Sequence, residues 1–223
     1  MSDPASTCPA WIWVAGCGLA CAVLLASEVR GRQAGVWIFK PAASACFVAL
    51  AWNLGAADSG YGRAILVGLG LSMAGDVLLI PRAAPRFFLA GITSFLCGHL
   101  AYAVAFCRLG VALLPALGLL LGLAPLAVLV LRWLRPALQG LFAVAVPVYV
   151  VVIFAMVALA GAASWQHGVV LPALGAALFA LSDVAVARDR FIAPSLANGA
   201  WGLPTYFVGQ LVLAASVVEV AAR

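Results

Sequence analysis

Long apolar stretches, separated by short polar connections, constrain the fold of this chain more than any other feature of its sequence. A membrane-spanning helix needs about 20 apolar residues in a row. Eight stretches of this kind occur, and the connections between them carry the Gly, Pro and Arg residues typical of turns. The predicted spans are residues 10–28, 36–55, 63–80, 86–107, 111–132, 137–160, 167–187 and 200–221.

The composition agrees with a chain that lies in a membrane. It is 66% hydrophobic and 9% charged, whereas a soluble domain is about half apolar and a quarter charged. The sequence therefore predicts an all-α fold, a polytopic bundle of eight transmembrane helices that forms one integral membrane domain over residues 1–223. The net charge of +5 comes without a cluster of Lys and Arg interleaved with aromatic residues, so we expect no nucleic-acid partner.

The basic residues predict how the chain is oriented. Nine of the twelve lie in or beside the first, third, fifth and seventh connections. These nine are Arg30, Arg32, Lys40, Arg82, Arg86, Arg132, Arg135, Arg188 and Arg190. Because loops rich in Lys and Arg stay in the cytoplasm, we expect the odd-numbered connections there and both termini on the outer side.

Two aspartates interrupt stretches that are otherwise almost wholly apolar. Asp76 lies in the third span, within LGLSMAGDVLLI, and Asp183 lies in the seventh, within AALFALSDVAVA. An ionisable side chain inside a membrane span costs several kcal/mol, so its default interpretation is functional. Both spans run in the same direction, and counting back from the next basic residue puts both carboxylates about 8–9 Å below the cytoplasmic helix ends. The shared depth allows the two aspartates to act as a pair.

A weak internal repeat accompanies the two aspartates. His99 follows Asp76 by 23 residues, and Tyr206 follows Asp183 by 23 residues. One explanation is coincidence among helices rich in Ala, Leu and Val. The other is a 4+4 duplication with parallel halves, related by an axis normal to the membrane, which would bring the third and seventh spans close to that axis.

Further polar side chains in the spans are candidates for binding or orienting a ligand. His99 and Tyr102 lie three residues apart, and Tyr206 and Gln210 four apart, so each pair shares one helix face. A lone histidine in a span also serves as a donor between helices, and a lysine near a helix end also extends to the lipid headgroups. The candidates are Lys40, His99, Tyr102, Tyr149, Tyr206 and Gln210.

No metal or other cofactor is predicted. The chain has two histidines, His99 and His167, so a three-histidine zinc site cannot form within one chain. The six cysteines include no CxxC pair, which argues against a zinc ribbon. A site made by His99 with both aspartates stays open. Buried aspartates and a parallel repeat fit an enzyme and a proton-coupled transporter equally well.

Five motifs in the chain resemble the lysoplasmalogenase family, the YhhN-like group of membrane proteins, in their order and spacing. The resemblance runs from the second span to the eighth. The motifs are Lys40-Pro41, SMAGDVLL (72–79), GHLAY (98–102), LSDVAVA (181–187) and YFVGQ (206–210).

The resemblance implies an eight-span hydrolase that cleaves the vinyl ether bond of lysoplasmalogens. The products would be a fatty aldehyde and glycerophosphoethanolamine or glycerophosphocholine. The substrate would be a lysophospholipid taken from the bilayer, and the setting the inner membrane of a bacterium, with the active site nearer the cytoplasmic face.

Vinyl ether hydrolysis fits the two aspartates. It begins with proton transfer to the β-carbon, which leaves an oxocarbenium ion at the α-carbon, and water then adds there to form a hemiacetal that collapses. The reaction needs an acid, an anion and a base, and two carboxylates that share one proton supply all three. Asp76 and Asp183 are therefore the predicted catalytic residues, with their individual roles open.

The other polar residues would assist this pair. Tyr206, Tyr149 and His99 are expected to orient the carboxylates, the ether oxygen or the water. Lys40, together with Arg86 or Arg190, is expected to hold the phosphate at the cytoplasmic interface. The alternative from a different class is a small proton-coupled transporter or lipid carrier that uses the same aspartates.

Overall fold

The computed structural model describes residues 8–81 and 85–223, and its regular structure is helical throughout this part of the chain. Eight of its helices are long and apolar enough to cross a membrane, which confirms the predicted all-α fold. The protein is an integral membrane protein. The eight helices are α1 (Ala10–Val29), α2 (Gln33–Asn53), α3 (Gly60–Leu78), α4 (Pro85–Leu109), α5 (Leu113–Leu134), α6 (Phe142–His167), α7 (Leu171–Ala187) and α8 (Leu196–Ala221).

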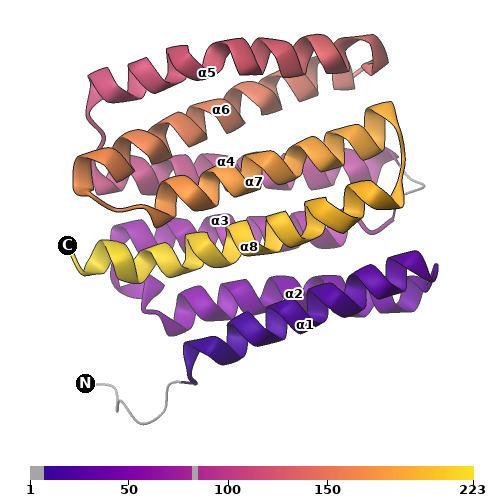
Figure 1. Cartoon of the computed structure of the whole chain (residues 1–223), viewed down its shortest axis with the longest axis horizontal. Helices are drawn as coiled ribbons and strands as arrows, with labels where there is room; N and C mark the ends of the chain where they lie inside the picture. The colour runs from indigo at the N-terminus through magenta and orange to yellow at the C-terminus, as the bar shows by residue number, and fades with distance from the viewer. Residues whose placement is uncertain (1–7, 82–84) are drawn as a thin grey trace.

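Short helices fill three of the connections. Two are 3-10 turns, η2 (Ala56–Asp58) and η3 (Arg135–Ala137), and the third is a π-helix, η4 (Arg188–Ile192), which extends α7. The long helices run side by side, and the start of α1 lies at the same end of the bundle as the end of α8 (Figure 1). Arg82, one of the residues behind the predicted orientation, lies outside the described residues.

The sixth span differs most from its predicted bounds, because α6 runs from Phe142 to His167 and not over 137–160. Residues 161–167 are mostly small and helix-compatible, so the helix continues to Gly168, whose φ of 64° ends it. The seventh span accordingly begins at Leu171 and not at His167. Hydropathy locates the apolar centre of a helix, whereas its ends depend on capping and turn residues.

Four central helices, α3, α4, α7 and α8, lie between the α1–α2 pair on one side and the α5–α6 pair on the other (Figure 1). The most extensive packing joins α3 to α4 and α7 to α8. In addition, α2 packs on α8 and α6 packs on α4, so the second helix of each half lies against the last helix of the other half. A 4+4 duplication, one of the two explanations for the repeat in the sequence, predicts such matching neighbours.

Glycines allow the close approach of α3 and α4. A Cβ atom on Gly68 would lie 2.3 Å from the ring of Tyr102, and one on Gly75 would lie 2.7 Å from the ring of Phe95. Small residues at such positions are typical of helix contacts in membranes, where packing drives association. Gly75 directly precedes Asp76, whose side chain is bound by residues of α2 and α8.

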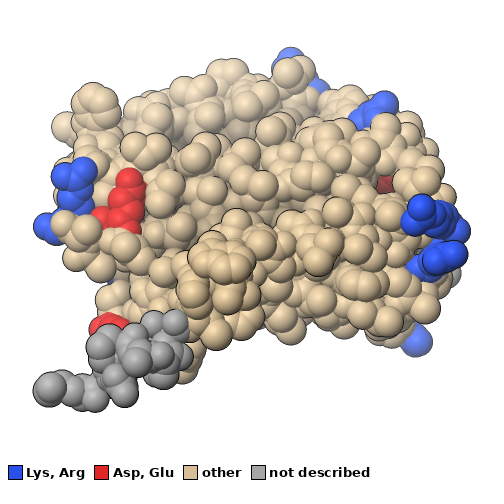
Figure 2. All heavy atoms as spheres, turned by 60° about the horizontal axis from the view of Figure 1, so that its bottom comes forward, with Lys and Arg blue, Asp and Glu red and all other residues tan. Residues whose placement is uncertain are grey.

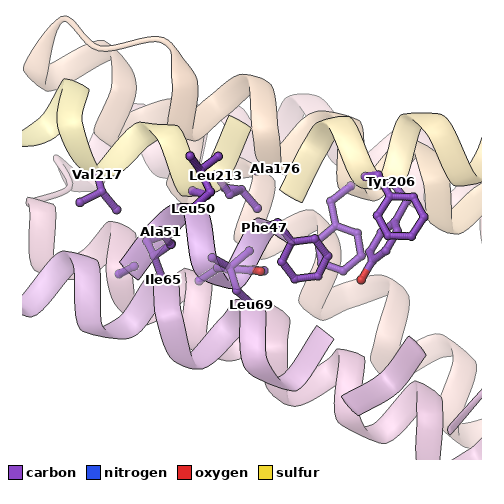
Figure 3. Packing of buried hydrophobic residues seen from close by; sticks show 14 of the residues in the cluster. Phe47, Leu50, Ala51, Ile65, Leu69, Ala176, Tyr206, Leu213 and Val217 are labelled. Carbon is purple, nitrogen blue, oxygen red and sulfur yellow. The ribbon is translucent and has the colours of Figure 1, made fainter. Parts of the chain in front are cut away.

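The main hydrophobic core lies among the helices other than α5. Figure 3 shows part of it, where Phe47 of α2 lies near Tyr206 of α8 and Leu50 lies near Leu213. A second, smaller cluster joins α5 to α6 through Leu134, Val146 and Val150. Figure 2 shows a broad band of uncharged surface, with most charged side chains near the two ends of the molecule.

Candidate active site

A cavity of about 690 Å³ lies at the end of the bundle that is opposite the chain termini, and both aspartates line it. Its wall includes Gly31, Pro81 and Pro194 from the first, third and seventh connections. These connections are the ones that the basic residues predict to be cytoplasmic. The structure therefore brings Asp76 and Asp183, from opposite halves of the chain, to one cavity.

Asp76 is almost completely buried, with 3% of its side chain exposed, and it is surrounded by donors. Its Oδ2 accepts hydrogen bonds of 2.6 Å from both Ser44 Oγ and Tyr206 Oη. Its Oδ1 lies 3.4 Å from the Lys40 ammonium. One cation and two hydroxyl donors are suitable partners for a carboxylate anion.

Asp183 has a different set of partners and is more accessible, with 14% of its side chain exposed. Its Oδ2 lies 3.2 Å from His99 Nε2 and accepts a hydrogen bond of 3.4 Å from Tyr149 Oη. His99 Nε2 is also 3.2 Å from that hydroxyl. The His99 ring is fully buried and packs on Phe179 with 4.3 Å between ring centroids. With a proton on Nε2, His99 donates a hydrogen bond to this carboxylate.

The two carboxylates therefore lie in one cavity, and each has its own set of side-chain partners. No hydrogen bond between Asp76 and Asp183 occurs in the described part of the chain. Asp76 lies two residues before the last residue of α3, and Asp183 lies four residues before the last residue of α7. At 1.5 Å per residue Asp76 lies about 3 Å below the end of α3, which is shallower than predicted because α3 ends before Arg82. Asp183 lies about 6 Å below the end of α7, and η4 continues that helix through Arg188 to Ile192.

Two of the candidate residues lie away from the cavity and bind each other. Tyr102 Oη donates a hydrogen bond of 2.6 Å to Gln210 Oε1, and Ser72 Oγ lies 3.5 Å from the same hydroxyl. Both Tyr102 and Gln210 are fully buried. They form a polar contact between α4 and α8 that contacts neither carboxylate.

The two arginine candidates differ in their position relative to the cavity. Arg190 lines the cavity, and its guanidinium lies 4.5 Å from the centre of the Phe88 ring. Arg86 is exposed and lies over the Phe87 ring at 5.2 Å, and it does not line the cavity. A cation on the face of an aromatic ring is attracted by the ring quadrupole, so Phe88 helps to hold Arg190 at the cavity mouth.

The comparison with known families decides which group this chain belongs to. The YhhN family model matches residues 35–217, which include all of the candidate site residues. The chain belongs to the YhhN family. The resemblance of the five motifs to this family is thereby confirmed.

Curated proteins that resemble this YhhN chain carry lysoplasmalogenase names. The Bos taurus protein named Lysoplasmalogenase TMEM86A is 36% identical over 163 residues, which cover 70% of this chain and 65% of the relative. Its Homo sapiens counterpart is 35% identical over 162 residues, with the same coverage of 70% and 65%. Lysoplasmalogenase TMEM86B from Homo sapiens is 32% identical over 181 residues, which cover 78% of this chain and 71% of the relative.

The YhhN chain spans about 65% of the length of the first two of these relatives. No solved structure matches it.

Two polar residues of this YhhN site, Ser44 and Asn198, were not predicted from the sequence. Ser44 follows Lys40 by four residues, so both lie on one face of α2 and reach Asp76 together; that spacing was the available signal. Asn198 is buried near the mouth, where its Nδ2 donates to Asp189 Oδ1 at 3.0 Å and to the Ala193 carbonyl at 2.8 Å. Its Oδ1 accepts from Arg188. Nothing local in the sequence indicates these contacts.

Proposed function

We propose that this YhhN protein hydrolyses the vinyl ether bond of lysoplasmalogens, with Asp76 and Asp183 as its catalytic groups. The products are a fatty aldehyde and glycerophosphoethanolamine or glycerophosphocholine, and the substrate is a lysophospholipid from the bilayer. The observation that carries the proposal is the presence of both carboxylates, each with its own donors, in one cavity of about 690 Å³. The lysoplasmalogenase names of the relatives support the same chemistry.

The surroundings of the carboxylates favour different roles for them. Asp76 has the Lys40 ammonium and two hydroxyl donors as partners, which suits the group that stays anionic. Asp183 has no lysine or arginine among its contacts in the described part of the chain, and it is the more exposed to the cavity. Asp183 is therefore assigned as the acid, and Asp76 as the anion and base.

In the proposed reaction Asp183 first transfers its proton to the β-carbon. The electrons of the double bond form the new C–H bond, and the positive charge is shared by the α-carbon and the ether oxygen. The carboxylate of Asp76 stabilises this cation. Water then attacks the α-carbon and gives its proton to Asp76, which produces the hemiacetal.

Collapse of the hemiacetal restores both carboxyl groups. Asp76 returns its proton to the glycerol oxygen as the carbon–oxygen bond breaks, and Asp183 takes the proton of the hemiacetal hydroxyl as the aldehyde forms. One water is consumed and no proton is gained or lost. Tyr206 and Ser44 orient Asp76, while His99 and Tyr149 orient Asp183.

The phosphate of the headgroup is assigned to Arg190 and not to Arg86. Arg190 lines the cavity, whereas Arg86 is exposed outside it. Lys40, also expected to hold the phosphate, has its ammonium beside Asp76. Its charge therefore acts mainly on that carboxylate.

The proposed setting is the inner membrane of a bacterium, with both termini outside the cytoplasm and the active site toward the cytoplasmic face. The distribution of Lys and Arg supports this orientation. A C-terminal fusion to a reporter that is active only in the periplasm, compared with one active only in the cytoplasm, tests it. Activity of the cytoplasmic reporter would reverse the orientation.

The direct test is release of fatty aldehyde from lysoplasmenylethanolamine by the purified protein. The saturated ether analogue is the control, because it lacks the double bond that accepts the proton. Aldehyde from the vinyl ether alone supports the proposal, and its absence over a range of pH and headgroups contradicts it. Proton-coupled uptake into liposomes would then test the transporter alternative.

A transporter would need access to the aspartates from both sides of the membrane. On the side away from the cavity, the bundle is filled by the main hydrophobic core, where Leu50, Ile65 and Leu213 are at most 2% exposed. A site reached from one end is the arrangement that an enzyme requires. This observation favours the hydrolase over the transporter.

A further inference from the structure

We propose that the lysoplasmalogen lies across the cavity with its alkenyl chain against α6 and its glycerol toward α1, α2 and α8, so that Asp183 faces the β-carbon and Asp76 the α-carbon. This inference rests on the proposed function and adds the direction in which the substrate binds. It is drawn from the distribution of polar and apolar side chains on the cavity wall.

The α6 side of the cavity is apolar. This helix contributes Val146, Val150, Ile153 and Phe154 to the wall, and Tyr149 is its one polar lining residue. Val146, Val150 and Ile153 are at most 7% exposed. Apolar surface of this kind gains free energy by covering a hydrocarbon chain, about fourfold in affinity for each buried methylene.

The opposite side of the cavity carries more polar side chains. There α1, α2 and the start of α8 contribute Glu28, Gln33, Lys40 and Ser195 beside apolar residues such as Val36 and Leu203. Figure 1 shows α2 and α6 on opposite sides of the four central helices. A glycerol with its free hydroxyl needs hydrogen-bond partners when it leaves water, and this wall supplies them.

The two carboxylates are attached to these two sides. Asp183 is hydrogen-bonded to Tyr149, the polar residue of the apolar α6 wall. Asp76 is bound by Ser44 and Lys40 of α2, on the polar side. In a vinyl ether the β-carbon carries the hydrocarbon chain, and the α-carbon carries the oxygen that leads to glycerol. A chain on α6 therefore presents the β-carbon to Asp183 and the α-carbon to Asp76.

This direction of binding agrees with the roles derived from the charges. The β-carbon receives the proton, so the acid must lie on the chain side, where Asp183 is. The positive charge and the attacking water are at the α-carbon, so the anion must lie on the glycerol side, where Asp76 is. Two observations of different kinds thus assign the same role to each aspartate.

A matched pair of substitutions tests the direction of binding. Val150→Phe adds bulk to the α6 wall, and Val36→Phe makes the same change in α2, whose Val36 also lines the cavity. Each variant is assayed for aldehyde release from a short-chain and a long-chain lysoplasmenylethanolamine, presented at equal mole fraction in mixed micelles. Displacing one or two methylenes from the wall costs about 4- to 15-fold in affinity.

The expected result is that Val150→Phe lowers kcat/KM for the long-chain substrate about tenfold more than for the short-chain substrate, whereas Val36→Phe changes both by the same factor. Ile153→Ala provides a second measurement on the same wall should the larger side chain prevent folding, and it too should affect the long chain more. If only Val36→Phe discriminates between the two chain lengths, the proposed direction of binding is wrong. It is also wrong if no variant discriminates between them. No aldehyde from either substrate with the unchanged protein overturns the proposed function as well.

Discussion

His99 and Tyr206 occupy corresponding positions in the two halves of the chain, and each binds the aspartate of the other half. His99 follows Asp76 by 23 residues and contacts Asp183 at 3.2 Å. Tyr206 follows Asp183 by 23 residues and donates to Asp76 at 2.6 Å. A 4+4 duplication with parallel halves, one of the two explanations for the repeat, predicts this exchange. Because histidine and tyrosine differ chemically, the two aspartates have different partners.

Removing either carboxylate is expected to abolish turnover while leaving the protein folded. Asp76→Asn and Asp183→Asn keep the size of the side chain but cannot supply the proton or the anion. General acid or base groups contribute about 10²–10⁴-fold to rate, so aldehyde release should fall by at least that range. Asp58→Asn, the same change at an exposed site in η2, is the control. Substantial activity in either cavity variant would remove that carboxylate from the mechanism.

Substitution of Tyr206 in α8 is expected to lower activity, whereas substitution of Tyr102 in α4 is expected to lower stability. Tyr206→Phe removes a donor to Asp76, so kcat should fall by about 10- to 100-fold, in line with a charge-assisted bond of 1.5–3 kcal/mol. Tyr102→Phe leaves Gln210 Oε1 without this donor and should cost about 1–3 kcal/mol of stability with little change in kcat. Steady-state kinetics and thermal unfolding in detergent measure the two effects. Equal losses of kcat would mean that the Tyr102 contact also supports the reaction.

Lys40 is expected to stabilise the folded protein through Asp76. Lys40→Met leaves that carboxylate buried without its cation, and breaking a buried pair in this way costs about 3–5 kcal/mol. Adding Asp76→Asn removes the unpaired charge, so the double variant should unfold at a higher temperature than Lys40→Met alone. Lys40→Arg, which keeps the charge, is the control. A double variant no more stable than the single one would show that the ion pair contributes little.

The two arginine candidates should differ in their effect on the headgroup. Arg190→Ala should raise KM for lysoplasmenylethanolamine about 10- to 100-fold, because a hydrogen bond to a charged group contributes about 1.5–3 kcal/mol. A 1-alkenylglycerol, which lacks the phosphate, should be cleaved by this variant as well as by the unchanged protein. Arg86→Ala is the matched control and should alter neither substrate. Equal losses of activity on both substrates would mean that Arg190 supports the structure of the cavity and does not bind the phosphate.

Two glycines of α3 test how closely this helix packs on the preceding turn η2. A Cβ on Gly62 would lie 2.2 Å from the backbone oxygen of Ala56, whereas nothing lies within 4 Å of a Cβ on Gly70. Gly62→Ala should therefore destabilise the protein by about 1–3 kcal/mol. Gly70→Ala should be neutral or stabilising by about 0.5–1 kcal/mol, because alanine favours the helix. Thermal unfolding of the two variants compares them directly, and equal midpoints would contradict the close contact at Gly62.

The sequence by itself determined the eight spans, the presence of two aspartates at similar depth in spans of the same direction, and the family. Hydropathy and motif spacing carry this information because both are local properties of the chain. Both ends of α6 and the start of α7 were less predictable, since Gly168 and the short helix at Arg135–Ala137 determine them.

Only the tertiary structure decided which donors serve which aspartate. Tyr102 and Tyr206 have similar sequence contexts, each beside a second polar residue on one helix face, yet Tyr206 reaches Asp76 while Tyr102 pairs with Gln210. Ser44, which resembles many other serines in apolar helices, lies 2.6 Å from Asp76. The physical reason is that a side chain's partner depends on how each helix is rotated and packed against helices distant in sequence. Those contacts arise from the whole bundle and leave no periodic signal in any one segment.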